Sequence, residues 1–170
     1  AFIGLHSVKL SELVGPSGKI FSFEPIPFVC ECLRTTVADG DYSNIQVICK
    51  PLSDTIDTPL SFVSDLDGKS AVDIYRRKSF KYSFDLLSTT LDYHLRNQNL
   101  EKLKLIKIDV EGSEWNVLRG SEGIIDKWRP IIVLETWPTK SNLKKLTQFS
   151  EKYKYDIVTS TCDNYLLYPL

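Results

Sequence analysis

One stretch decides the fold of this chain: Ile106-Lys107-Ile108-Asp109-Val110-Glu111-Gly112-Ser113-Glu114. An apolar strand runs directly into three carboxylates and a glycine, and ligands of parallel α/β sheets bind at the carboxyl ends of such strands. Alternation with period two puts Lys107 and Asp109 on the same side of the strand. A lysine in a buried strand is costly unless a carboxylate or a ligand pairs with it. The stretch therefore predicts a strand that ends in a functional site.

Length and composition set the class of protein. The chain has 170 residues, of which 42% are apolar and 25% are charged, as expected of one globular domain. The net charge of -1 gives no indication of the basic surface that binds nucleic acid. No apolar run approaches the roughly 18 residues that a membrane span needs. We therefore predict a single globular domain with no nucleic-acid partner and no membrane span.

The cysteines show no metal-binding spacing. Cys30 and Cys32 are too close for a C-x-x-C arrangement, and Cys49 and Cys162 are isolated. Most of them lie in apolar or helical context, which favours reduced thiols in the core. Reduced thiols indicate a reducing compartment, and the predicted location is cytoplasmic.

Strand and helix patterns alternate along the chain. Residues 5–14 have the apolar spacing of a half-buried helix, Pro27 can open the next helix, and Thr90 or Asp92 can cap another. Further helices are predicted near 115–118 and 143–153, and strands at 19–23, 45–49, 60–63, 84–87, 103–108, 131–134, 155–160 and 165–168. Asp163-Asn164 predicts a hairpin between the last two strands. Residues 64–83 are expected to form a long loop, which is a candidate lid over the site.

Six motifs in this order resemble a known family. They are Val14-Gly15-Pro16-Ser17-Gly18-Lys19, Phe23-Glu24-Pro25, Thr90-Leu91-Asp92, Lys107 to Glu114, Val117-Leu118-Arg119-Gly120, and Arg129-Pro130 with Glu135. Together they resemble the FkbM family of methyltransferases, which mostly methylate hydroxyl oxygens of sugars and natural products. The resemblance implies an α/β, Rossmann-like class I methyltransferase with a mostly parallel sheet and a C-terminal antiparallel hairpin. It implies S-adenosyl-L-methionine as cofactor and a small-molecule or glycan acceptor, and it leaves the oligomeric state open.

The family opens with a strand and the turn Asp-x-Gly-Ala-Asn-x-Gly. Only the tail of this turn has a match here, as Ala1-Phe2-Ile3-Gly4, and Phe2 stands where the family has Asn. Residues 1–170 are therefore expected to form a single methyltransferase domain that lacks its first strand. The natural protein is expected to continue upstream with a short apolar strand.

The resemblance assigns four residues to the cofactor. Gly4 belongs to the glycine turn, and Glu24 lies 20 residues further on, where dinucleotide folds place the carboxylate that binds the ribose. Ser53 is expected at the adenine, although a plain turn explains Ser53 equally well. Asp109 is expected near the methyl group.

Asp109 and Glu111 are the candidate catalytic carboxylates. A hydroxyl acceptor must lose a proton during methyl transfer, and a placed carboxylate can take it. Lys107 would hold Asp109 ionised or orient the acceptor, whereas Glu114, in the first turn of a helix, is expected to be structural. The alternative hypothesis is that a Mg²⁺ ion is coordinated by Asp109, Glu111 and Glu135. Trp137 either stacks on a sugar ring or fills the core.

Two other functions stay open at this point. A nicotinamide-dependent oxidoreductase shares the βαβ pattern and Glu24, but the chain has no G-x-G-x-x-G and the terminal hairpin disfavours it. The third hypothesis is a degenerate domain that binds a partner without catalysis. It is motivated by Phe2, which stands where the family has Asn.

Overall fold

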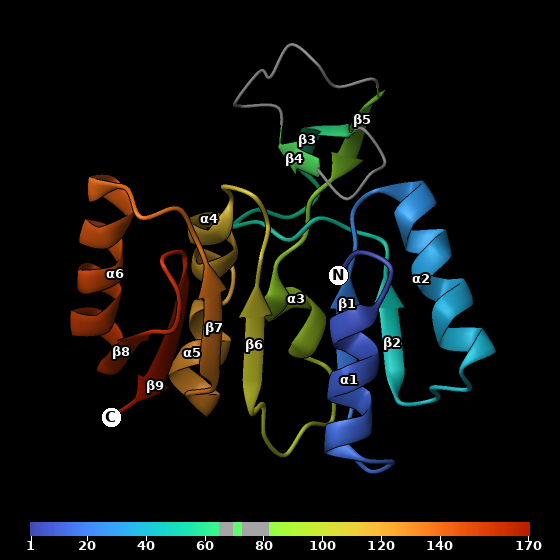
Figure 1. The fold of residues 1–170 in the computed structure, drawn as a ribbon, viewed down its shortest axis with the longest axis horizontal. Helices are drawn as coiled ribbons and strands as arrows, with labels where there is room; N and C mark the ends of the chain where they lie inside the picture. The colour runs from blue at the N-terminus through green and yellow to red at the C-terminus, as the bar shows by residue number, and fades with distance from the viewer. Residues whose placement is uncertain (65–69, 73–81) are drawn as a thin grey trace. The chain divides into compact units, whose positions relative to one another are not determined.

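A computed structural model describes residues 1–64, 70–72 and 82–170 of the chain (Figure 1). The chain falls into two compact units. The first comprises Ala1–Leu52 and Asp57–Ser88, and the second comprises Ser53–Ile56 and Thr89–Leu170. Each unit is described by itself.

The first unit holds two small sheets. Its elements are α1 (Leu5–Val14), β1 (Ile20–Phe23), α2 (Pro27–Asp39), β2 (Ile45–Ile48), β3 (Pro59–Ser64), β4 (Ser70–Val72) and β5 (Tyr82–Leu87). Strands β1 and β2 pair in parallel, and β3 pairs antiparallel with both β4 and β5. The expected loop over 64–83 is therefore wrong at β4, because three residues are too few to show alternation. The remainder of the expected lid, 65–69 and 73–81, lies outside the described residues.

Helix α1 has the predicted bounds but buries a different face. Its buried residues are Ser7 and Ser11, while Leu13 is 81% exposed. The Ser7 hydroxyl accepts a hydrogen bond of 2.8 Å from Ser22, and the Ser11 hydroxyl donates one of 2.6 Å to Asn44. Small hydroxyl side chains allow a close approach and satisfy their own polar atoms, so the prediction from apolar spacing chose the wrong face.

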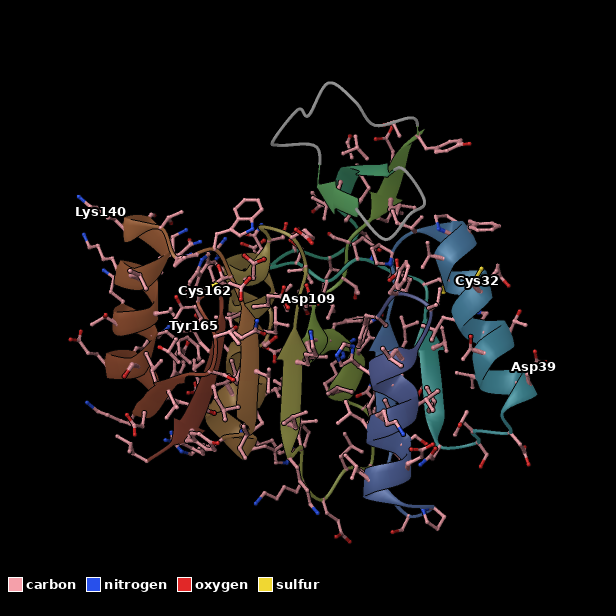
Figure 2. The ribbon with its side chains drawn as sticks, in the orientation of Figure 1. Cys32, Asp39, Asp109, Lys140, Cys162 and Tyr165 are labelled. Carbon is pink, nitrogen blue, oxygen red and sulfur yellow. A yellow bond between two sulfur atoms is a disulfide. The ribbon has the colours of Figure 1, made fainter. Side chains whose placement is uncertain are left out.

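Helix α2 begins with Pro27 in its first turn, as predicted, and buries Val29, Cys30 and Leu33. Cys30 forms a disulfide with Cys49, which follows β2, and their Cα atoms are 5.8 Å apart. The expectation of reduced thiols is therefore wrong for this pair, whereas Cys32 and Cys162, labelled in Figure 2, are free. Disulfides persist in oxidising surroundings, so the pair removes the support that reduced thiols gave to a cytoplasmic location.

The second unit holds a four-stranded mixed sheet. Its elements are α3 (Leu91–Leu95), β6 (Leu105–Ile108), α4 (Glu114–Arg119), α5 (Glu122–Trp128), β7 (Ile131–Glu135), α6 (Lys140–Tyr153), β8 (Tyr155–Thr159) and β9 (Asn164–Pro169). The strand order is β6-β7-β9-β8. Strands β6 and β7 are parallel, and β9 pairs antiparallel with β7 and with β8. The α/β class is confirmed, but the described sheets are small and mixed rather than one mostly parallel sheet.

The core of this unit lies along its inner strands. Ile132 and Leu134 of β7 and Leu167 of β9 are fully buried, and Thr90 caps α3 by accepting a hydrogen bond from the backbone of Tyr93, as predicted. Helix α5 was not predicted from the sequence. In the described part of the chain, no helix combines the length and apolar content that a bilayer crossing needs.

Candidate active site

The first charged pair of the site, Lys107 and Asp109, lies at the carboxyl end of β6. The Lys107 ammonium lies 2.9 Å from a carboxylate oxygen of Asp109, in an ion pair that solvent partly reaches. Figure 2 labels Asp109 at the carboxyl end of β6. The alternation argument is therefore confirmed: both side chains lie on one side of the strand, and each supplies the partner that the other needs.

Strand β7 brings Glu135 to the same edge of the sheet. The parallel register pairs Ile108 with Leu134, so Asp109 and Glu135 are the next positions on two adjacent strands. On its other side, Glu135 pairs with Asn164 of β9. A pocket opens at this edge, lined by Asp109, Glu111, Gly112, Glu114, Glu135, Thr136, Trp137 and Asp163.

The turn between β6 and α4 has a strained backbone. Glu111 has φ 52° and Gly112 has φ 109°, two successive residues in the left-handed region. Buried Glu114 accepts a hydrogen bond of 2.6 Å from the amide of Gly112, and its other oxygen lies 3.5 Å from the hydroxyl of Thr136. Glu114 thus fixes the turn that presents Glu111, and burial raises the pKa of the Glu114 carboxyl. Non-glycine residues with positive φ concentrate at functional sites.

The charged groups around Glu135 are mostly carboxylates. Partial burial raises the pKa of its carboxyl first, and the neighbouring charge of Asp109 raises it further, while the Lys107 ammonium opposes the shift. Asp163 and Glu111 add to the increase. Two adjacent carboxylates in one pocket therefore have different surroundings, because Lys107 bonds directly to only one of them.

A hydrogen-bond network holds the backbone of Trp137 beside the pocket. The side-chain amide of Asn142 donates to the carbonyl of Trp137 and to the hydroxyl of Thr136, both at 3.0 Å, and its oxygen accepts a bond of 3.0 Å from Trp115. Trp137 is 42% exposed and so does not fill the core. Sequence reasoning missed Asn142, because nothing in its spacing connects it with Trp137.

Ser53 lies in the second unit and is buried. Its amide donates to the carbonyl of Thr89 at 2.8 Å, and its hydroxyl donates to Asp54 at 3.1 Å. Asp54 in turn accepts a bond of 2.9 Å from Arg119. The carbonyl of Ser53 lies so close to Gly120 that a Cβ at Gly120 would collide with it.

The first unit holds Gly4 and Glu24. Gly4 has φ 104°, and a Cβ there would lie 2.8 Å from Leu33, so the position requires glycine. The buried Glu24 carboxylate accepts bonds of 2.7 Å from the amide of Phe2 and 3.1 Å from that of Ile26, and it pairs with the Ala1 ammonium.

Some of the predicted site residues lie together within one unit. Lys107, Asp109 and Glu111 come together in the second unit, where Glu135 joins them. In the described residues, no group of three histidine, cysteine, aspartate or glutamate side chains has a metal-binding arrangement, so the geometry gives the Mg²⁺ alternative no support.

The electrostatics of the pocket predict a pH dependence of stability. Because folding raises the pKa of Glu135, its ionised form costs stability at neutral pH, and this cost disappears as the pH falls towards the ordinary value of 4.5. Glu135→Gln should therefore raise the free energy of unfolding at pH 7, and its advantage should vanish near pH 4.5. Urea unfolding at a series of pH values measures both. Exposed Glu151→Gln is the control, and equal behaviour of the two variants would contradict the prediction.

An α/β chain with carboxylates gathered at the ends of parallel strands has the architecture of an enzyme that binds its ligands at a sheet edge. The chain belongs to the methyltransferase FkbM domain family, whose sequence model matches residues 3–157. S-adenosyl-L-methionine is the general methyl donor of such methyltransferases.

Three relatives illustrate the similarity. The chain is 28% identical to methyltransferase sdnD of Sordaria araneosa over 188 residues, which cover 92% of this chain and 71% of that protein. A shorter match of 45 residues, 40% identical, links it to a protein-L-isoaspartate O-methyltransferase of Methanothrix thermoacetophila, covering 26% of this chain and 21% of that one. The crystal structure of an FkbM methyltransferase from Methylobacillus flagellatus KT shares the fold, with a TM-score of 0.68 and 17% identity. The match covers 99% of this chain but only 41% of the solved one.

Proposed function

We propose that the protein transfers a methyl group from S-adenosyl-L-methionine to a hydroxyl of a sugar or natural product. The observation that carries the proposal is the carboxylate pocket at the ends of β6 and β7, in a domain of the FkbM family. The cofactor supplies a methyl group on positively charged sulfur. The five carboxylates that line the pocket would attract a cationic group of this kind.

Each unit contributes its own proposed cofactor contacts. In the first unit these are Gly4, at the glycine turn, and Glu24, for the ribose. In the second unit they are Ser53, for the adenine, and Asp109, for the sulfonium. These assignments accompany a Rossmann-like class I arrangement, in which cofactor contacts follow the carboxyl ends of the strands.

The proposed catalytic group consists of Lys107, Asp109 and Glu111. Methyl transfer is an in-line displacement, so positioning of the reactants supplies much of the rate. The Lys107–Asp109 ion pair holds both side chains in place at the strand end, and the turn held by Glu114 presents Glu111 at the pocket.

The pocket also favours one kind of acceptor. The relative from Methanothrix thermoacetophila is named for a carboxylate acceptor, isoaspartate. Five carboxylates around this pocket would repel a second anion, whereas hydroxyl groups can donate hydrogen bonds to them. The exposed Trp137 ring offers the flat apolar face on which sugars stack. Both features support a neutral hydroxyl acceptor.

Calorimetric titration tests the proposal against its two alternatives. S-adenosyl-L-methionine and S-adenosylhomocysteine should bind, and NAD should not. Binding of NAD alone would establish the oxidoreductase instead. Cofactor binding without methyl transfer to any of a panel of glycosides and hydroxylated natural products would favour the degenerate binding domain.

Asp109→Asn should separate two ligands that differ in charge. Removal of the carboxylate should weaken binding of the cationic S-adenosyl-L-methionine by roughly three- to tenfold, the scale of a partly exposed charge pair, and should affect neutral S-adenosylhomocysteine less. Calorimetry with both ligands measures the difference. Asp126→Asn is the matched control, since it removes the same charge from an exposed residue of α5. Equal loss for both ligands would show that Asp109 does not face the sulfur.

A further inference from the structure

We propose that Glu135, rather than its neighbour Asp109, is the carboxylate that accepts the acceptor's proton, and that Lys107 and Asp109 form an ion pair beside it that stays intact. This assignment rests on the proposed methyl transfer and adds a catalytic residue to it. From the sequence, the only chemical role that Glu135 suggested was that of a ligand to Mg²⁺.

The two carboxylates at the ends of the neighbouring strands β6 and β7 have different partners. Asp109 and Glu135 follow a parallel pair in register, and both line the pocket. Asp109 is committed to Lys107 at 2.9 Å, an ion pair that its protonation would break. Glu135 makes no comparable ion pair with any described residue, so it can gain a proton without losing a partner.

The surroundings of Glu135 suit a base. From β6 it faces Asp109 and Lys107, from the turn after β6 it faces Glu111, and from the β8–β9 connection it faces Asp163. Burial and three carboxylates raise the pKa of Glu135 against one ammonium. A carboxylate with a raised pKa takes up a proton more readily near neutral pH, and pairs of carboxylates in contrasting surroundings mark acid–base assignments.

Methyl transfer to a hydroxyl group releases one proton, which a base must accept. The acceptor oxygen forms a new C–O bond as the C–S bond breaks, and the electron pair of that bond stays on sulfur. Glu135 takes the hydroxyl proton and passes it to solvent through the mouth of the pocket. Neither Asp109 nor Lys107 changes its charge, so both keep the same field throughout turnover.

The first test needs no acceptor. Carbon-13 NMR of glutamate-labelled protein follows each carboxyl with pH, and Glu135→Gln identifies the resonance of Glu135 by its disappearance. The midpoint of Glu135 should lie above the ordinary glutamate value. It should fall in Asp109→Asn, which removes a negative neighbour, and rise in Lys107→Met, which removes the positive one. An ordinary midpoint, or one that neither variant moves, overturns the proposal.

The second test follows turnover as release of S-adenosylhomocysteine, with whichever methyl glycoside the wild-type protein methylates. The rate should rise through the measured midpoint of Glu135, and Glu135→Gln should lose about 10²-fold or more together with this pH limb, the usual scale of general base catalysis. Asp109→Asn should keep the limb and move it to lower pH. Retention of the limb by Glu135→Gln overturns the proposal. Failure of the wild type to bind S-adenosylhomocysteine would instead overturn the proposed methyl transfer, while the midpoint of Glu135 would still be measurable.

Discussion

Loss of the Cys30–Cys49 disulfide is expected to lower the free energy of unfolding by roughly 3 kcal/mol, the chain-entropy scale for a loop of about this length. The bond joins α2 to the end of β2 across a sequence separation of 19 residues. Its removal gives the unfolded chain more conformations and lets the first turns of α2 move away from the strand. Urea unfolding of the wild type with and without dithiothreitol, and of Cys30→Ala/Cys49→Ala, measures the effect.

Thiol counting supplies the control for this prediction. In urea without reductant, two of the four cysteines, Cys32 and Cys162, should react with a thiol reagent, and all four should react after reduction. Dithiothreitol should not change the stability of the double variant. Four reactive thiols before reduction would show that the bond does not form.

Gly120→Ala is expected to destabilise the second unit by about 3 kcal/mol, the upper range for overpacking, because the new methyl group would strike backbone rather than a movable side chain. A Cβ at Gly120 would collide with the carbonyl of Ser53 and approach Thr90 to 3.2 Å. Neither Ser53 nor Thr90 can retreat easily, because Ser53 is bonded to Thr89 and Thr90 caps α3. For a chain of this size the midpoint of thermal unfolding should fall by roughly 6–12 °C.

Gly123→Ala provides a matched control in the neighbouring helix α5. Its added methyl would meet the carboxylate of Asp92 at 3.1 Å, which is the end of a side chain rather than backbone and is a less severe approach than that at Gly120. Calorimetric scans of the two variants should therefore differ by several degrees. A Gly120→Ala protein as stable as Gly123→Ala would mean that the Ser53 loop does not rest against α4.

The order of helices and strands was largely predictable, because it follows from local signals. Pro27 begins α2, Thr90 caps α3, and the apolar run at 131–134 becomes β7. The Lys107–Asp109 pair was also predictable, since period two fixes the side of the strand on which each residue lies. These features depend on residues close together in sequence.

The features that were missed depend on residues far apart in sequence. Nothing local distinguishes Cys30 from Cys32 as the partner of Cys49. The buried face of α1 depends on Ser22 and Asn44, which lie outside the helix. The position of Glu135 beside Asp109 became visible only with the register between β6 and β7.

The place of β9 in its sheet has a consequence for synthesis on the ribosome. Strand β9 follows β8 in sequence yet lies between β7 and β8, so β8 joins the sheet only through it. While the chain emerges, β7 exposes one unpaired edge until Asn164–Pro169 leave the exit tunnel, and such edges recruit other chains. The β7 edge is thus open to aggregation until β9 arrives, and a ribosome-bound chaperone would help the nascent chain during that interval.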